Sequence, residues 1–212
     1  MRRILISIFL IFPLFFLSAQ ENDLQSWHSF SLKNKINKTT DINLKVGARF
    51  RENSSLLDKN FLEVRLKKEL NKRTSISAGY RNTYNYDTEF VLVKQNRFYF
   101  DLIYKNKLTK RLSYSIRNRW QNQVSIYQSA RTFRQKFSLE YNIRKTKLTP
   151  YCAVEYFSNS FDHINKLRST ISLSYPISKD IDVDFAYRMQ NEFWVNNPQT
   201  IFIFETKISY SL

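Results

Sequence analysis

Apolar and polar side chains alternate along most of the chain after residue 40. In residues 42–51, Leu44 and Val46 alternate with Lys45 and Arg49. A period of two is typical of a β-strand whose two faces meet different surroundings. The pattern recurs in the segments 62–67, 76–84, 97–105, 112–120, 133–143, 151–156, 167–175, 181–190 and 202–212. The chain therefore predicts ten strands, with a weaker eleventh around Phe30 and Leu32.

The connections between these segments differ in length in an alternating way. Short, lysine-rich connections occupy 71–73, 106–110, 144–147 and 178–180, and longer ones occupy 52–60, 87–95, 121–130, 158–165 and 193–200. Short turns at one end and longer loops at the other are typical of outer-membrane barrels. The pattern predicts an all-β fold, an antiparallel up-and-down transmembrane β-barrel of about 10–12 strands.

Alternation alone would also suit a soluble β-sandwich, in which the apolar face packs against a second sheet. Aromatic residues near the strand ends, such as Tyr84 and Trp120, favour a membrane barrel with aromatic girdles. The last strand, which ends at Tyr210 and Leu212, resembles the terminal signal that the barrel-assembly machinery recognises. We therefore expect two partners, this machinery during insertion and outer-membrane lipid afterwards.

The first residues have the composition of a secretory signal peptide. Arg2 and Arg3 precede an apolar run over 4–17, and Ala19 offers a small residue for cleavage before Gln20. We expect a signal peptide over 1–19 and an outer-membrane barrel over 20–212, located in the cell outer membrane. An uncleaved anchor is the alternative, although the run is shorter than the roughly 20 residues of a spanning helix.

Strand parity constrains residues 20–40, which form an N-terminal segment or an extra strand before the ten strands of 41–212. A bacterial barrel is expected to hold an even number of strands. The strand around Trp27 to Leu32 would make the count odd. It could pair outside the barrel wall, fold into the interior or accompany a twelfth strand.

The polar faces of the predicted strands are rich in arginine. The formal net charge is +16, and loss of Arg2 and Arg3 would lower it to +14. The predicted interior basic cluster comprises Arg49, Arg51, Arg65, Arg81, Arg97, Arg117, Arg119, Arg134, Arg168 and Arg188. Acidic residues on the same faces, expected to pair with it, are Glu63, Asp101, Glu140, Glu155, Asp182, Asp184 and Glu205.

This cluster leaves two interpretations open. Arginine arrays suit anion binding or anion-selective permeation, which predicts a porin-like protein with a small anionic solute as partner. Alternatively, the acidic residues neutralise the arginines, and the interior is a structural plug. Nucleic acid would also suit the basic charge, but the signal segment disfavours it, and we expect no nucleic-acid partner.

Catalytic and metal chemistry has little support. His163 follows Ser158, Ser160 and Asp162 in one predicted loop, which favours a solvated loop over a hydrolytic triad. The two distant histidines, His28 and His163, and the single Cys152 cannot form a zinc site. We expect no catalytic residue, no metal and no cofactor, and hence no enzyme. An outer-membrane lipase or protease at the barrel rim, or a soluble periplasmic β-sheet protein that binds an anionic ligand, are the alternatives.

Three short motifs resemble those of an uncharacterised family. Gln25-Ser26-Trp27 lies near the predicted mature start, the basic strand 46–51 follows, and Ala78-Gly79-Tyr80-Arg81 lies in a later strand. This arrangement resembles the DUF2490 family over most of the mature chain. The resemblance implies an outer-membrane β-barrel without known activity, so that no catalytic residues can be assigned from it.

Overall fold

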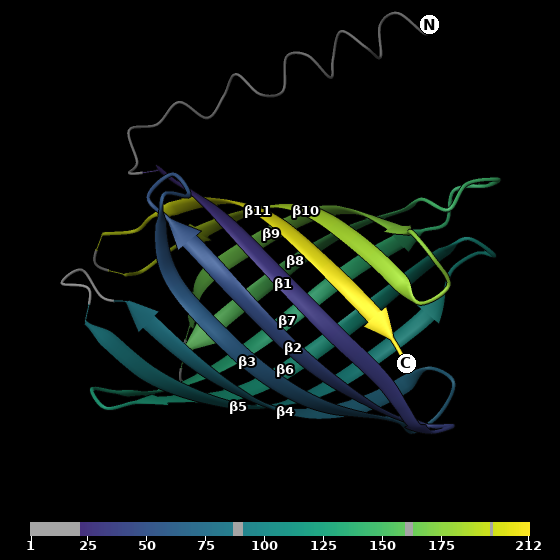
Figure 1. The fold of residues 1–212 in the computed structure, drawn as a ribbon, viewed down its shortest axis with the longest axis horizontal. Helices are drawn as coiled ribbons and strands as arrows, with labels where there is room; N and C mark the ends of the chain where they lie inside the picture. Colours follow the sequence, from purple (N-terminus) through teal and green to yellow (C-terminus); the bar gives the residue numbers. More distant parts are fainter. Residues whose placement is uncertain (1–21, 87–90, 160–162, 196) are drawn as a thin grey trace, which may run out of the picture.

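The described part of the chain forms a closed β-barrel (Figure 1). The computed structural model describes residues 22–86, 91–159, 163–195 and 197–212. Within these ranges it contains eleven strands: β1 (Asn22–Asn37), β2 (Thr40–Arg51), β3 (Leu56–Glu69), β4 (Thr74–Tyr86), β5 (Leu92–Lys107), β6 (Leu112–Ser125), β7 (Ser129–Tyr141), β8 (Thr149–Asn159), β9 (His163–Pro176), β10 (Ile181–Glu192) and β11 (Thr200–Ser211). The prediction of an all-β barrel of 10–12 strands is confirmed. The predicted signal peptide, 1–19, lies outside the described residues.

The barrel closes through a parallel pair of strands. Every strand from β2 to β11 pairs antiparallel with its neighbour in sequence, whereas β1 lies between β2 and β11 and runs parallel to β11 (Figure 1). The parallel register extends from Asn22 opposite Thr200 to Lys33 opposite Ser211. An odd number of up-and-down strands makes the first and last strands run in the same direction. The expected even count is therefore wrong, and the segment around Trp27 lies in the wall itself.

The strands are longer than the alternating segments that predicted them. β3 begins at Leu56, so the connection predicted over 52–60 contracts to 52–55. Conversely, the connection from β7 to β8 covers 142–148, although a short turn was predicted there. The predicted alternation of long and short connections is thus wrong. Polar residues such as Asn60 continue the strands because backbone pairing between neighbours does not require an apolar side chain.

The two faces of the wall have opposite character. Outward-facing Phe98 and Ile171 are 57% and 61% exposed, whereas inward-facing Asp101 and Glu155 are 0% and 3% exposed. A water-soluble fold would bury its apolar residues and leave its charges in water. This inverted distribution matches a barrel whose outer wall contacts lipid.

No helix in the described residues is long and apolar enough to cross a bilayer.

The two glycines of the chain make room for inward-facing aromatic rings. A Cβ atom at Gly47 would lie 2.5 Å from Cζ of Phe61, on the neighbouring strand β3. A Cβ atom at Gly79 would overlap the ring of Tyr99 on β5. A ring laid over a strand glycine fills the gap that the missing side chain leaves. These rings form part of the surface that faces the barrel interior.

Candidate functional site: an arginine-lined interior

The barrel encloses a cavity of about 630 Å³, here called the interior cavity, and all eleven strands contribute side chains to it. Nine of the ten predicted arginines line it: Arg49, Arg65, Arg81, Arg97, Arg117, Arg119, Arg134, Arg168 and Arg188. Arg51 does not line this cavity. It ends β2, where its Nε lies 3.6 Å from a carboxylate oxygen of Glu52.

The predicted acidic partners are distributed less evenly. Glu63, Glu155 and Glu205 line the interior cavity. Asp184 on β10 accepts a 2.6 Å hydrogen bond from Lys207 on β11. Asp182 lies at the start of β10, and Glu140 near the end of β7 forms an exposed ion pair with Lys105, at 3.1 Å. Asp101 is fully buried.

Arg119 and Asp101 form a buried, doubly hydrogen-bonded ion pair. Nε and Nη2 of Arg119 donate to the two carboxylate oxygens of Asp101 at 2.6 and 2.8 Å, and Ser77 donates a third hydrogen bond at 3.0 Å. The guanidinium also lies 3.7 Å from the ring centroid of Tyr99. Strands β5 and β6 place the two charged residues directly opposite each other. The charge of Arg119 is therefore compensated locally.

Glu155 is shared by three arginines. Its carboxylate lies 2.5 Å from Arg117, 2.8 Å from Arg134 and 3.6 Å from Arg168, which extend from β6, β7 and β9. Two further pairs complete the network, Arg81 with Glu63 at 2.6 Å and Arg188 with Glu205 at 2.5 Å. Because one carboxylate cannot neutralise three guanidinium groups, positive charge remains around Glu155.

Within the part of the chain that the structure describes, three other arginines of the cavity have no carboxylate partner, and two of them contact neutral groups instead. Arg49 lies over Trp27, 3.7 Å from the ring centroid. Arg97 donates two hydrogen bonds to the side-chain oxygen of Gln123. The buried Nε of Arg65 has no hydrogen-bond partner in the described structure. Cation–π contacts and amide hydrogen bonds hold a guanidinium in place without removing its charge.

The interior cavity therefore carries a large positive surplus. Among the described residues, fifteen lysine and arginine side chains line it, against five carboxylates. Two further carboxylates, Asp101 and Asp184, do not line the cavity but pair with Arg119 and Lys207, so basic groups still clearly outnumber acidic ones. Buried charges of one sign attract counter-ions or charged solutes into a cleft, because the low-dielectric walls focus their field.

Two groups of interior residues were not predicted from the sequence. The predicted basic cluster contained only arginines, whereas lysines such as Lys45 and Lys136 line the cavity beside them. The inward-facing aromatic residues form the second group: Arg81 lies 4.0 Å from the ring centroid of Phe61, and Arg134 lies 4.4 Å from that of Phe157. The alternation of inward- and outward-facing positions could have found both groups. Each of these residues lies an even number of positions from an interior charge on its own strand.

The remaining chemistry is sparse. His163 begins β9, but residues 160–162 and the side chain of His163 lie outside what the structure describes. The hypothesis of a hydrolase at the barrel rim therefore concerns residues outside the described structure. Cys152 is exposed on the outer wall. Among the described residues, no group of three or more His, Cys, Asp or Glu side chains is arranged to hold a metal ion.

Comparison with known proteins identifies the family. The sequence model described as "Protein of unknown function (DUF2490)" matches residues 24–200. The chain belongs to the DUF2490 family. The predicted resemblance is therefore confirmed. No curated protein matches the chain by sequence.

Solved structures share the fold of this DUF2490 protein. A KdgM porin, in a structure described as a complex with disordered oligogalacturonate, has a TM-score of 0.52 at 14% identity, covering 79% of this chain and 91% of that one. A NanC porin has a TM-score of 0.51 at 12% identity, covering 79% and 86% of the two chains. At these identities the likeness establishes a common barrel architecture.

Proposed function

We propose that this DUF2490 protein is a non-enzymatic outer-membrane barrel that admits small anionic solutes to its interior and passes them across the membrane. The observation that carries the proposal is the charge of the interior cavity, in which fifteen basic side chains face five carboxylates. The apolar outer wall supports placement in a bilayer, since the strands satisfy one another's backbone groups without an open edge. The signal-like segment 1–19 supports export to the outer membrane.

Arginine favours a particular class of solute. The guanidinium group is weakly hydrated and presents a planar fork that matches a carboxylate or phosphate group. Several such groups around one cavity suit a solute that carries more than one anionic group. A volume of about 630 Å³ falls within the range of small-molecule sites, about 300–1,000 Å³. The KdgM porin structure, described as a complex with oligogalacturonate, makes acidic saccharides the first class to test here.

A structural plug is the competing function, and the buried ion pairs favour it. Asp101 and Glu155 are 0% and 3% exposed, which shows that side chains fill part of the interior. A barrel of this kind would be mechanically stable and impermeable. The two functions differ in one measurable property, the passage of ions.

Reversal potentials in planar lipid bilayers test the proposal. Under a potassium chloride gradient, the purified barrel should conduct with a preference for chloride over potassium. The Arg49→Gln/Arg97→Gln variant should reduce that preference, because it removes two interior charges that have no carboxylate partner in the described structure. The control is Lys94→Gln/Arg131→Gln, which removes two charges from exposed positions instead. Silent bilayers, or a preference for potassium, would contradict the transport proposal.

A further inference from the structure

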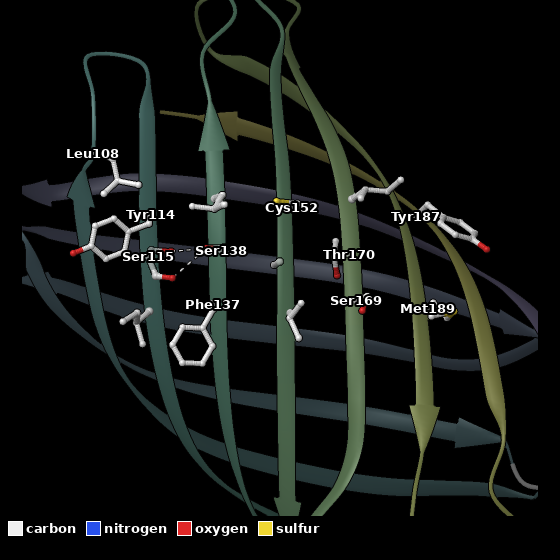
Figure 2. Close-up of a pocket in the computed structure, with 15 residues that line it drawn as sticks. Leu108, Tyr114, Ser115, Phe137, Ser138, Cys152, Ser169, Thr170, Tyr187 and Met189 are labelled. Carbon is white, nitrogen blue, oxygen red and sulfur yellow. Dashed lines mark hydrogen bonds between the residues drawn. The ribbon is translucent and has the colours of Figure 1, made fainter. Parts of the chain in front are cut away.

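The outer wall of the barrel is hollowed over strands β6 to β10. This groove, here called the wall groove, has a volume of about 1,000 Å³. Figure 2 shows its lining, with Tyr114 and Phe137 on one side of Cys152, and Tyr187 and Met189 on the other. The groove lies outside the barrel and shares no charged residue with the interior cavity.

Differences in side-chain size produce the hollow. The outward-facing residues Cys152, Val154 and Ser169 on β8 and β9 are small. Larger aromatic side chains lie on either side of them (Figure 2). Ser115 and Ser138 also contribute to the floor, although their hydroxyl groups point inward and hydrogen-bond to each other at 2.6 Å. The lining is therefore apolar, with the exception of a few hydroxyl groups and one thiol.

Basic side chains crowd the end of the wall that the groove approaches. Leu108, which lines the groove, belongs to the turn between β5 and β6. This turn and those from β7 to β8 and from β9 to β10 carry seven exposed basic residues, at their ends or within them: Lys107, Lys110, Arg111, Arg144, Lys145, Lys147 and Lys179. Asp180 is the one carboxylate within the three turns. No ion pair within the described residues involves any of the seven.

The opposite end of the same wall has a different composition. The connections 126–128, between β6 and β7, and 193–199, between β10 and β11, contain no charged residue. The basic residues are thus concentrated at the end from which the groove extends. Clusters of lysine and arginine beside a membrane-embedded surface attract anionic lipid headgroups.

We propose that the wall groove and the three basic turns form a binding site for an anionic phospholipid. The acyl chains would lie in the groove, against Val154 and Ser169, and the phosphate would meet the basic turns, with Arg144 and Lys145 as its main contacts. Charge complementarity selects this occupant, since acyl chains of a neutral lipid would fill the groove without using the turns. The inference rests on the membrane placement proposed above, but not on transport.

Native mass spectrometry of the detergent-purified barrel tests the site. The protein is incubated with equal amounts of phosphatidylglycerol and phosphatidylcholine, and the lipid retained by the folded barrel is counted. We expect each barrel to retain one lipid molecule, and phosphatidylglycerol to be retained about ten times as often as phosphatidylcholine. Several basic residues at a membrane surface would produce such a preference. The Arg144→Gln/Lys145→Gln variant should lose this preference, and Ser169→Phe, which fills the groove, should lower retention of both lipids.

Matched controls lie on the far side of the barrel. Lys35→Gln/Lys38→Gln removes two exposed charges at the turn between β1 and β2, and Ala48→Phe enlarges an outward-facing residue on β2. Both should leave lipid retention unchanged, and a band shift on heating in detergent confirms that each variant is folded. Equal retention of the two lipids, or no effect of Ser169→Phe, would overturn the proposal. A dimer that forms without lipid and is lost in Ser169→Phe would assign the groove to a second copy of the chain.

The outcomes separate the two proposals. Lipid selectivity in a barrel that conducts no ions would leave the phospholipid site intact and remove transport. Anion conductance with no lipid selectivity would support transport and remove the phospholipid site. A chain that stays folded and monomeric without detergent would end both, because the outer wall would then face water.

Discussion

Arg119 on β6 and Asp101 on β5 lie directly opposite each other and form two hydrogen bonds of 2.6 and 2.8 Å inside the barrel. Both side chains are almost fully removed from solvent, at 8% and 0% exposure. Two buried charges in this geometry depend on each other, because either one alone would remain uncompensated in a low-dielectric interior. The pair therefore stabilises this register of β5 against β6 from within the barrel.

Replacing Asp101 with Asn should destabilise the barrel strongly. The change leaves the guanidinium of Arg119 buried without its carboxylate, which costs about 3–5 kcal/mol when a buried pair loses one partner. Urea titration of the refolded barrel, followed by the gel shift between folded and unfolded forms, measures the loss. The control is Glu140→Gln, which breaks an ion pair of 54% and 42% exposed side chains and should cost about 1 kcal/mol or less. Equal losses in the two variants would contradict the structure.

Replacing Gly79 with Ala should also destabilise the barrel, through a clash rather than a lost charge. The added methyl group would overlap the ring of Tyr99, and overpacking of this kind costs about 1–3 kcal/mol. The double variant Gly79→Ala/Tyr99→Ala relieves the overlap, so its unfolding free energy should exceed the value expected from adding the two single losses. Strict additivity in this cycle would show that the ring does not lie over the glycine.

Glu155→Gln should make the barrel more selective for anions. This residue is the one carboxylate shared by Arg117, Arg134 and Arg168, so its loss raises the positive surplus of the interior cavity. Reversal potentials under a potassium chloride gradient should shift further toward the chloride equilibrium potential. Glu140→Gln serves again as the control, because its ion pair is exposed near the end of β7. A shift toward potassium would contradict the proposed role of the interior charge.

The placement of the arginines was predictable because a strand has a period of two. Once one residue of a strand is assigned to the interior, every second residue follows it, and Arg117 and Arg119 illustrate the rule. Arg51 departs from it at the end of β2, where the register with β3 shifts after Arg49 and the backbone turns at Glu52 with φ of 53°. Periodicity holds within a strand and fails where the strand ends.

The sequence pattern could not predict which carboxylate each arginine meets. Arg119 could have met any of the predicted carboxylates, and the register of β5 against β6 decides that it meets Asp101. The pattern could not predict where the strands end either, since Asn60 and Asp58 are residue types common in loops but continue β3. Strand direction leaves no trace in an alternating pattern, and so the parallel pairing of β1 with β11 could not be foreseen.

A disulfide across the closing pair of strands tests the parallel register. His28 lies opposite Thr206, and both face outward. In a Cys152→Ser background, His28→Cys/Thr206→Cys should therefore form an intrachain disulfide under mild oxidation, because directly paired strand residues lie within the span that a disulfide can bridge, about 4.4–6.8 Å between Cα atoms. His28→Cys/Phe204→Cys, which is two residues out of register, should cross-link much less. Faster gel migration without reducing agent reports the bond. If the out-of-register pair cross-links as well or better, β1 does not run beside β11 as described, and a barrel of eleven strands could not close in this way.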